Sequence, residues 1–351
     1  MEAAAYGLPG QRGKPLGLSL LERRQRVLLT DGFDRSFKYL RLSLTDVCNF
    51  KCQYCLPDGY KACGGKAPLT LEELRRAATA FSELGLSKIR LTGGEPTIRK
   101  DFEDIARMIG ALPGVETLAL TTNGYRLAER AKAWRAAGIT AINISLDSVS
   151  AENFYRITGH DRQAEVMRGI DAAFEAGFET IKINAVYLKG INEHEISSYQ
   201  ALTKDRPLSV RFIELMETGD HAAFFKDHYI SAEILKEKLI TDGWTPKLKA
   251  ANAGPANDYI HPNHAGSFGL IAPYSKDFCK SCNRLRFSSQ GKLHLCLFGE
   301  FGVPLRQLLQ HDEQVAELKE RIQMAVLKKN VRHNLGQGLT GATSNLSAIG
   351  G

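Results

Sequence analysis

From Phe37 onward the chain alternates short apolar runs with longer helical stretches, and this alternation limits its possible folds more than any other feature. Strands that alternate with helices in this way indicate parallel βαβ units. Six such units are too few for the eight of a closed (β/α)8 barrel, so we predict an α/β fold with a partial (β/α)6 TIM-like barrel. The predicted strands are 39–44, 88–92, 117–121, 141–146, 180–186 and 209–215, and the predicted helices are 71–84, 102–112, 127–137, 163–176 and 193–202.

The sequence divides into three predicted parts. Residues 1–36 carry a stretch rich in glycine and proline, which predicts a mobile N-terminal extension. Residues 37–228 hold the strand and helix alternation of the partial barrel. Residues 229–351 lose this alternation, and we expect a C-terminal α+β domain with a short hairpin and a helix over 304–327. The glycine-rich end from Gly336 predicts a mobile tail.

Composition and charge favour a globular protein with an anionic partner. The hydrophobic content of 43% and the charged content of 24% are ordinary for such proteins. No apolar run reaches the length of about 18 residues that a membrane span needs, so no membrane association is expected. The net charge of +7 suits a nucleic acid or a nucleotide polyphosphate, and charge alone does not separate the two. An odd count of seven cysteines and a start without an apolar signal core favour free thiols in a reducing cytoplasm.

Cys48, Cys52 and Cys55 follow the first predicted strand in the spacing Cys-x3-Cys-x2-Cys. Three thiolates in so short a loop can hold three irons of a [4Fe–4S] cluster. No fourth cysteine follows at a ferredoxin-like spacing, so the fourth iron is left open to a ligand that is not protein. A structural zinc site is the alternative, but such sites use four ligands and only one Cys-x2-Cys knuckle is present here. Cys63, the next cysteine, has no assigned role.

Polar residues also follow the next three predicted strands. Gly93-Gly-Glu-Pro96 comes after the second strand, Thr121-Thr-Asn-Gly124 after the third, and Ser145-Leu-Asp147 ends the fourth. Ligands of parallel α/β folds bind at the carboxyl ends of the strands. The Gly-Gly-Glu-Pro stretch alone is equally well explained as a turn. Polar residues at four successive strand ends are nevertheless hard to explain by packing, and they predict a ligand site.

The cysteine loop, with Tyr54 before its last cysteine, and the Gly-Gly-Glu-Pro stretch together resemble the radical S-adenosylmethionine superfamily. In that superfamily the methionine amino and carboxylate groups chelate the open iron, and the reduced cluster cleaves the sulfonium to release a 5′-deoxyadenosyl radical. The resemblance implies that Cys48, Cys52 and Cys55 ligate a [4Fe–4S] cluster. It also implies contacts to S-adenosylmethionine from Tyr54, Gly94, Ser145 and Met216.

A second set of three cysteines, Cys279, Cys282 and Cys296, has the spacing Cys-x2-Cys-x13-Cys. A second cluster with an open iron explains this count, while an incomplete zinc knuckle or unliganded buried thiols are the alternatives. Arg284 and Arg286 follow two residues apart on an extended segment, so they point to the same side. Guanidinium groups suit bidentate phosphate binding, although a solvated basic strand gives the same pattern.

Two three-cysteine sets, a partial barrel and the motif Cys-Asn-Arg-Leu-Arg286 together resemble the GTP 3′,8-cyclase family of molybdenum cofactor biosynthesis over residues 37–351. The resemblance implies a lyase that converts GTP into (8S)-3′,8-cyclo-7,8-dihydroguanosine 5′-triphosphate with S-adenosylmethionine and two [4Fe–4S] clusters, the second in the C-terminal domain. It implies a further phosphate contact from Arg211 and a Gly350-Gly351 tail that inserts toward the active site. The implied GTP contacts are Arg41, Arg90, Thr121, Lys182, Arg284, Leu285 and Arg286.

The same resemblance implies the partners of the chain. It predicts a cytoplasmic homodimer that takes electrons from an external donor and passes its product to a cyclic pyranopterin monophosphate synthase, with no nucleic acid bound. Two other interpretations remain open. A peptide-modifying radical enzyme with auxiliary clusters usually carries more C-terminal cysteines. A redox or nucleic-acid-binding iron–sulfur protein without catalysis is supported by the basic pI alone, since aromatic stacking platforms for bases are not evident.

Overall fold

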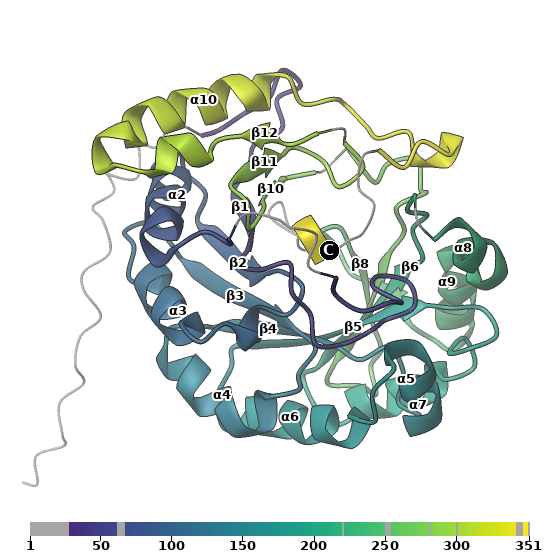
Figure 1. Ribbon diagram of the computed structural model, residues 1–351. Coiled ribbons are helices and arrows are strands. Elements are labelled where there is room, and N and C mark those ends of the chain that lie inside the picture. Colours follow the sequence, from purple (N-terminus) through teal and green to yellow (C-terminus); the bar gives the residue numbers. More distant parts are fainter. Residues whose placement is uncertain are drawn as a thin grey trace, which may run out of the picture.

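The computed structural model describes residues 28–61, 67–219, 221–249, 254–280, 282–299, 301–341 and 347–349 (Figure 1). Within these residues a single 12-stranded sheet curves around a central space, and helices cover its outer face. The strand order is β12-β11-β10-β1-β2-β3-β4-β5-β6-β9-β8-β7. No helix among the described residues is long and apolar enough to cross a bilayer.

The predicted alternation of strands and helices is confirmed, with most boundaries shifted by no more than a few residues. The strands of the barrel run parallel in sequence order, and the helices return between them. Helix α5 (Ala151–Thr158) is an additional helix after β4. The strands are β1 (Tyr39–Ser43), β2 (Lys88–Thr92), β3 (Thr117–Thr122), β4 (Ala141–Ser145), β5 (Thr180–Tyr187) and β6 (Ser209–Glu214), and the helices are α2 (Leu71–Glu83), α3 (Phe102–Gly110), α4 (Leu127–Ala136), α6 (Gln163–Glu175) and α7 (Ile196–Thr203).

The C-terminal segment adds strands to both edges of this barrel. On one edge β10 (Arg284–Phe287) pairs in parallel with β1, and on the other β9 (Ser267–Ile271) pairs in parallel with β6. The predicted hairpin is confirmed, because β8 (Asn257–Ile260) pairs antiparallel with β9. The partial barrel is therefore widened by residues far along the chain, which share its sheet. The outer elements are β7 (Thr245–Pro246), β11 (Lys292–His294), β12 (Val303–Pro304), α8 (Ala222–His228) and α9 (Ala232–Thr241).

The helix predicted over 304–327 is wrong in its first part. Residues 303–304 form β12, two short 3-10 helices follow at Arg306–Leu309 and Asp312–Gln314, and α10 spans only Val315–Leu327. The guanidinium of Arg306 donates to Glu73 of α2 at 2.8 Å and to the Ala67 carbonyl at 2.6 Å. These contacts hold the chain in a turn against α2 and delay the start of the helix.

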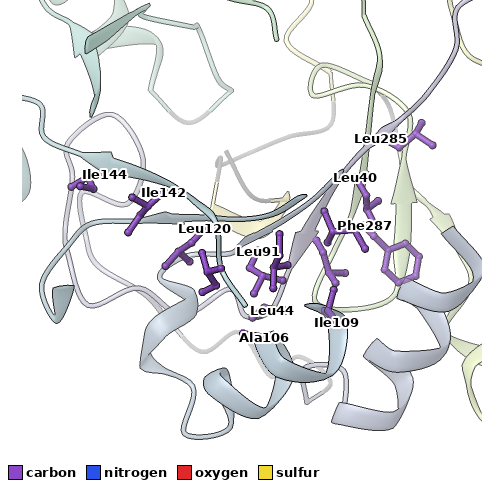
Figure 2. Packing of buried hydrophobic residues seen from close by; sticks show 14 of the residues in the cluster. Leu40, Leu44, Leu91, Ala106, Ile109, Leu120, Ile142, Ile144, Leu285 and Phe287 are labelled. Carbon is purple, nitrogen blue, oxygen red and sulfur yellow. The ribbon is translucent and has the colours of Figure 1, made fainter. Parts of the chain in front are cut away.

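The core lies between the sheet and its helices, as Figure 2 shows for the strands nearest α3. Leu40, Leu91 and Leu120 are fully buried in one hydrophobic cluster with Ala106 and Ile109. Successive side chains of a strand point to opposite faces. On each strand the residues before and after the leucine, many of them polar or charged, therefore point inward to the central space.

Short segments near both ends of the chain pack onto the barrel. Residues 1–27 lie outside the described residues, but 28–36 fold onto the body, where Leu29 and Asp31 are buried and Asp31 pairs with Arg35. At the other end Ser347–Ile349 form a 3-10 turn inside the barrel, with the Ile349 side chain buried (Figure 1). The mobility of the tail from Gly336 stays a prediction, and within it Ile349 supplies an apolar side chain that packs.

Candidate functional site

A cavity of about 810 Å³ opens inside the barrel, and its lining is strongly cationic. Ten of the described residues that line it are lysine or arginine, and none is aspartate or glutamate. Many cations gathered in a partly buried space form a site for a polyanion, since guanidinium and ammonium groups make strong hydrogen bonds to phosphate. The cations are Arg35, Arg41, Lys88, Arg90, Lys182, Arg211, Arg284, Arg286, Lys329 and Arg332.

The register of the sheet explains why these cations meet. Arg286, Arg41 and Arg90 are direct neighbours across β10, β1 and β2. Lys182 on β5 and Arg211 on β6 line the same cavity. Because all these strands are parallel, residues at matching heights point inward together. The parallel pairing of β10 with β1 thus adds the C-terminal arginines to a site that the barrel begins.

The predicted GTP contacts divide into three kinds. Arg41, Arg90, Lys182, Arg284 and Arg286 line the cavity, as does Arg211. Thr121 is not among the residues that line the cavity, but its hydroxyl accepts a hydrogen bond from Nη1 of the cavity residue Arg90 at 3.3 Å. Leu285 stands between two inward arginines, so its side chain points to the opposite face and is fully buried in the core (Figure 2). Only its main chain is available to a ligand.

Burial and the crowding of like charges lower the pKa of two of the ten cations that line the cavity, which together we call the cationic cage. Burial, followed by the charges of Arg211 and Lys88, lowers the pKa of Lys182 to about 7. Burial, followed by Arg41 and Arg284, lowers the pKa of Arg286 to about 9. A bound polyanion would raise both pKa values again, because nearby opposite charge favours the charged form. Binding of phosphate would therefore be accompanied by proton uptake at these cations.

The second cysteine set lines the same cavity. Cys279, Cys282 and Cys296 all line it and act on one another electrostatically. Burial opposes ionisation of Cys282, but Arg284 and Lys329 outweigh it and lower the pKa of this thiol. Thiolates are the form that binds iron. The arrangement therefore suits a metal cluster beside the cationic cage.

The first cysteine set lies in the loop after β1. Cys48 and Cys52 pack against the core, and the Phe50 amide donates to the Cys48 sulfur at 3.5 Å. Burial, followed by the charge of Glu95, raises the pKa of Cys48 to about 11, so iron binding at this set releases protons. The three thiols of this loop, Cys48, Cys52 and Cys55, fit the ligand set of an iron–sulfur cluster.

The two three-cysteine sets differ from a structural zinc site in ligand number and in spacing. Among the described residues, no three cysteine, histidine, aspartate or glutamate side chains gather closely enough to hold one metal ion. A structural zinc site gathers four ligands around one ion. A cluster instead gives each thiolate its own iron, which tolerates wider spacing.

The Gly-Gly-Glu-Pro loop holds the first cysteine loop in place. The amide of Gly94 donates to the Thr45 carbonyl at 2.8 Å, and the amide of Glu95 donates to the Val47 carbonyl at 2.8 Å. The buried Glu95 carboxylate accepts from the Thr122 hydroxyl at 2.8 Å and from the Asn123 amide at 2.7 Å. Glu95 therefore joins the ends of β2 and β3, and its oxygens are occupied by protein donors.

We expect Gly94→Ala to remove the first cluster. A Cβ at this position would lie 2.3 Å from the Val47 carbonyl oxygen, which is backbone and cannot move aside. The iron content of the purified protein should fall by about four atoms per chain, the content of one cluster. Gly110→Ala is the matched control, because its Cβ would approach nothing closer than 3.4 Å, and it should keep all the iron. Full iron in Gly94→Ala would contradict the close approach.

The other predicted S-adenosylmethionine contacts also lie at strand ends. Tyr54 is in the loop after β1, Ser145 ends β4, and Met216 follows β6 and lines the cavity. The Tyr54 hydroxyl donates to Asp147 at 2.8 Å, and the other oxygen of this carboxylate accepts from the Val186 amide at 2.8 Å. Burial raises the pKa of Asp147 to about 6. The loop is therefore tied to β4 and β5. Cys63, Gly350 and Gly351 lie outside the described residues.

Sequence reasoning missed Arg35, because it assigned residues 1–36 to a mobile extension. Its guanidinium donates to the carbonyls of Val331 at 2.6 Å, Asn330 at 2.7 Å and Cys279 at 3.3 Å, and to Asp31 at 2.7 Å. Arg35 thus joins the N-terminal segment to the second cysteine loop. Lys88 was also missed, although its position two residues before Arg90 on one strand could have revealed it.

We expect Arg35→Ala to loosen the loop that carries the second cysteine set. The substitution leaves three carbonyl acceptors without a donor and frees the loop that holds Cys279. Iron bound at the second set should fall by at least half, while iron at the first set should be unchanged. Iron analysis together with spectroscopy of a variant that lacks the first set measures this directly. Arg107→Ala, which breaks only an exposed ion pair with Asp104, is the control. Equal iron in both variants would contradict the role of Arg35.

Comparisons with known proteins agree with this geometry. The Radical SAM superfamily model matches residues 42–202, and the Molybdenum Cofactor Synthesis C model matches residues 208–335. A GTP 3′,8-cyclase of Aeromonas hydrophila subsp. hydrophila is 52% identical over 328 residues, which cover 92% of this chain and 96% of the relative.

Solved structures support the fold. Streptococcus suis SuiB bound to S-adenosylmethionine matches with a TM-score of 0.58 at 13% identity, over 87% of this chain and 70% of that one. SuiB bound to its precursor peptide SuiA matches with a TM-score of 0.56 at 13% identity, over 87% of this chain and 69% of that one. At such low identity the likeness concerns the fold alone. The sequence identity and the two matched family models show that this chain belongs to the GTP 3′,8-cyclase family of the radical S-adenosylmethionine superfamily.

Proposed function

We propose that this chain converts GTP into (8S)-3′,8-cyclo-7,8-dihydroguanosine 5′-triphosphate, the first step of molybdenum cofactor biosynthesis. In this reaction a hydrogen atom leaves C3′ of the ribose, C3′ bonds to C8 of guanine, and one electron and one proton complete the product. One observation carries the proposal: the cationic cavity that fits a triphosphate is lined by the second set of three cysteines. A nucleotide bound there has its phosphates and its base beside different features of one site.

The first cysteine set and its surroundings would hold the cofactor that starts the reaction. Cys48, Cys52 and Cys55 would each bind one iron of a [4Fe–4S] cluster, with contacts to S-adenosylmethionine from Tyr54, Gly94, Ser145 and Met216. Reduced cluster and S-adenosylmethionine together supply a 5′-deoxyadenosyl radical. The hydrogen bonds from Gly94 and Glu95 to the cysteine loop keep this loop at the mouth of the barrel.

The second set would hold a second [4Fe–4S] cluster and orient the substrate. Cys279, Cys282 and Cys296 would bind three of its irons, leaving one for the guanine base. Arg41, Lys182 and Arg286 would neutralise the triphosphate. The Ile349 carbonyl accepts from Arg286 Nη1 at 3.3 Å, and this contact brings the C-terminal turn into the cavity. The turn, and the Gly350-Gly351 end beyond it, would exclude water from the reacting ribose.

We extend the proposal to the partners of the chain. The reaction consumes electrons, which requires an external donor. As the enzyme that takes up the product we propose a cyclic pyranopterin monophosphate synthase, which the family resemblance implies. A cytoplasmic homodimer is the state that the family resemblance favours. The absence of carboxylates from the described cavity lining supports GTP rather than a peptide as substrate.

Anaerobic turnover tests the proposed function. The reconstituted enzyme is incubated with S-adenosylmethionine, dithionite and either GTP or ATP, and 5′-deoxyadenosine and nucleotide products are separated by chromatography. We expect 5′-deoxyadenosine to accumulate with GTP together with a cyclised nucleotide of unchanged mass. Accumulation that does not depend on GTP, or a GTP that is recovered intact, would overturn the proposal.

A further inference from the structure

Tyr39 is a weak acid in the middle of the cationic cage. It stands two residues before Arg41 on β1, so both side chains point inward, and its neighbours in register are Arg284 on β10 and Lys88 on β2. The Arg90 Nε donates to the Tyr39 hydroxyl at 2.5 Å. The Lys88 ammonium lies 5.2 Å from the centre of the phenol ring. Cations from three neighbouring strands therefore surround one phenol.

The charged groups that act most strongly on this phenol are positive. They are Arg41 on its own strand, Lys88 and Arg90 on β2, Arg211 on β6 and Arg286 on β10. Asp258 pairs with Arg211 at 3.3 Å and offsets that charge only in part. Among the described residues that line the cavity, Tyr39 is the only one with a side-chain oxygen that can ionise. The phenol is thus the one group there that can balance the cations with a negative oxygen.

Burial and the neighbouring charges together place the pKa of the Tyr39 phenol near neutral pH. Burial alone raises the pKa of Tyr39, but the charges of Arg90, Arg41 and Lys88 outweigh burial and lower this pKa to about 7. A phosphate that enters the cage brings negative charge close to the phenol oxygen. Negative charge nearby raises the pKa of an acid, so the phenolate would then take up a proton.

We propose that Tyr39 is a positioning residue whose phenol oxygen orients the Arg41 and Arg90 guanidinium groups in the empty cage and is protonated when the triphosphate of the substrate replaces it. The inference rests on the proposed function, because it takes GTP as the occupant of the cavity. Without substrate the phenolate reduces the repulsion among the cations. With substrate the neutral phenol keeps its hydrogen bond to Arg90, and the phosphates supply the negative charge.

The sign of the pH dependence follows from this exchange. The form that binds GTP best carries a neutral phenol, so GTP affinity should fall as the pH rises through the pKa of Tyr39. One proton exchanged changes the affinity by about tenfold per pH unit. Lys182 also gains a proton on binding, since its own pKa is lowered to about 7. The wild-type protein should therefore take up between one and two protons per GTP at pH 8, a range set by these two groups.

Calorimetry of GTP binding in buffers of different ionisation enthalpy counts these protons on the intact, reconstituted enzyme under anaerobic conditions. We expect Tyr39→Phe to take up about one proton fewer than the wild type at pH 8. The variant should bind GTP more weakly at pH 6, where it lacks the hydrogen bond to Arg90, and should lose this disadvantage at pH 9. Tyr155→Phe, an exposed tyrosine on α5, is the matched control and should behave like the wild type.

A variant that keeps the shape of Tyr39 but changes its acidity distinguishes the proposed proton exchange from a purely structural role. Replacement of Tyr39 by a fluorinated tyrosine gives a more acidic phenol of nearly the same size, so the pH at which proton uptake begins should move down. An unchanged proton count in Tyr39→Phe, or an unmoved midpoint in the fluorinated protein, would overturn this inference alone. Failure of the wild type to bind GTP would instead overturn the proposed function.

Discussion

Cys52→Ser should abolish the formation of 5′-deoxyadenosine while leaving GTP bound. Cys52 is one of only three thiols in the first loop, and its loss leaves two irons of the cluster without protein ligands. Its peptide carbonyl accepts hydrogen bonds from Cys55 at 2.9 Å and Leu56 at 2.8 Å, which serine at this position preserves. The loop should therefore keep its shape and lose only its metal. We expect activity to fall by at least about 10⁴-fold, since no other group supplies the radical.

Iron analysis and GTP binding separate this effect from unfolding. The wild type should hold about eight irons per chain and Cys52→Ser about four, the content of the second cluster. GTP affinity should stay within threefold of the wild type, because the cationic cavity and Cys279, Cys282 and Cys296 are untouched. Cys63→Ser, which changes the one cysteine outside both sets, is the control. Residual 5′-deoxyadenosine formation above one hundredth of the wild-type rate would contradict the role of the first set.

The barrel could be predicted because its signals are local. Apolar runs of strand length, broken by helices that end at Gly85, Gly138 and Gly177, fix both the type and the order of the elements, and these glycines have the positive φ that such turns favour. Alternation along 39–43 also fixes which side chains point inward. The inward positions of Arg41 and Arg90 therefore follow from the sequence without any knowledge of tertiary contacts.

The remaining features depend on contacts between distant segments. The pairing of β10 with β1 joins residues more than two hundred positions apart, and no local sequence pattern predicts it. The same holds for Arg35, whose hydrogen bonds reach Asn330 and Val331. The buried turn at Ser347–Ile349 escaped prediction because a glycine-rich end is locally typical of a mobile tail, and only the cavity gives Ile349 a place to pack.

Arg286→Ala should weaken GTP binding more than any other substitution in the cage. Arg286 is 8% exposed, neighbours Arg41 in register and lines the cavity beside Cys296, so it stands between the proposed phosphate and base positions. Truncating one partner of a buried, hydrogen-bonded charge pair costs about 2–5 kcal/mol, which corresponds to a loss of roughly 30-fold to several thousand-fold in affinity. The substitution also removes the donor to the Ile349 carbonyl and should loosen the C-terminal turn.

Arg286→Lys distinguishes the charge of this residue from its shape. Lysine restores a positive charge but not the planar fork that binds phosphate in bidentate fashion, so it should recover only part of the lost affinity. GTP dissociation constants from anaerobic calorimetry measure both variants, and Arg206→Ala, which breaks an exposed pair with Asp171, is the control. Because neither variant touches the first cysteine loop, both should keep the iron of the first cluster. An affinity within threefold of the wild type in Arg286→Ala would show that the triphosphate does not occupy this cavity.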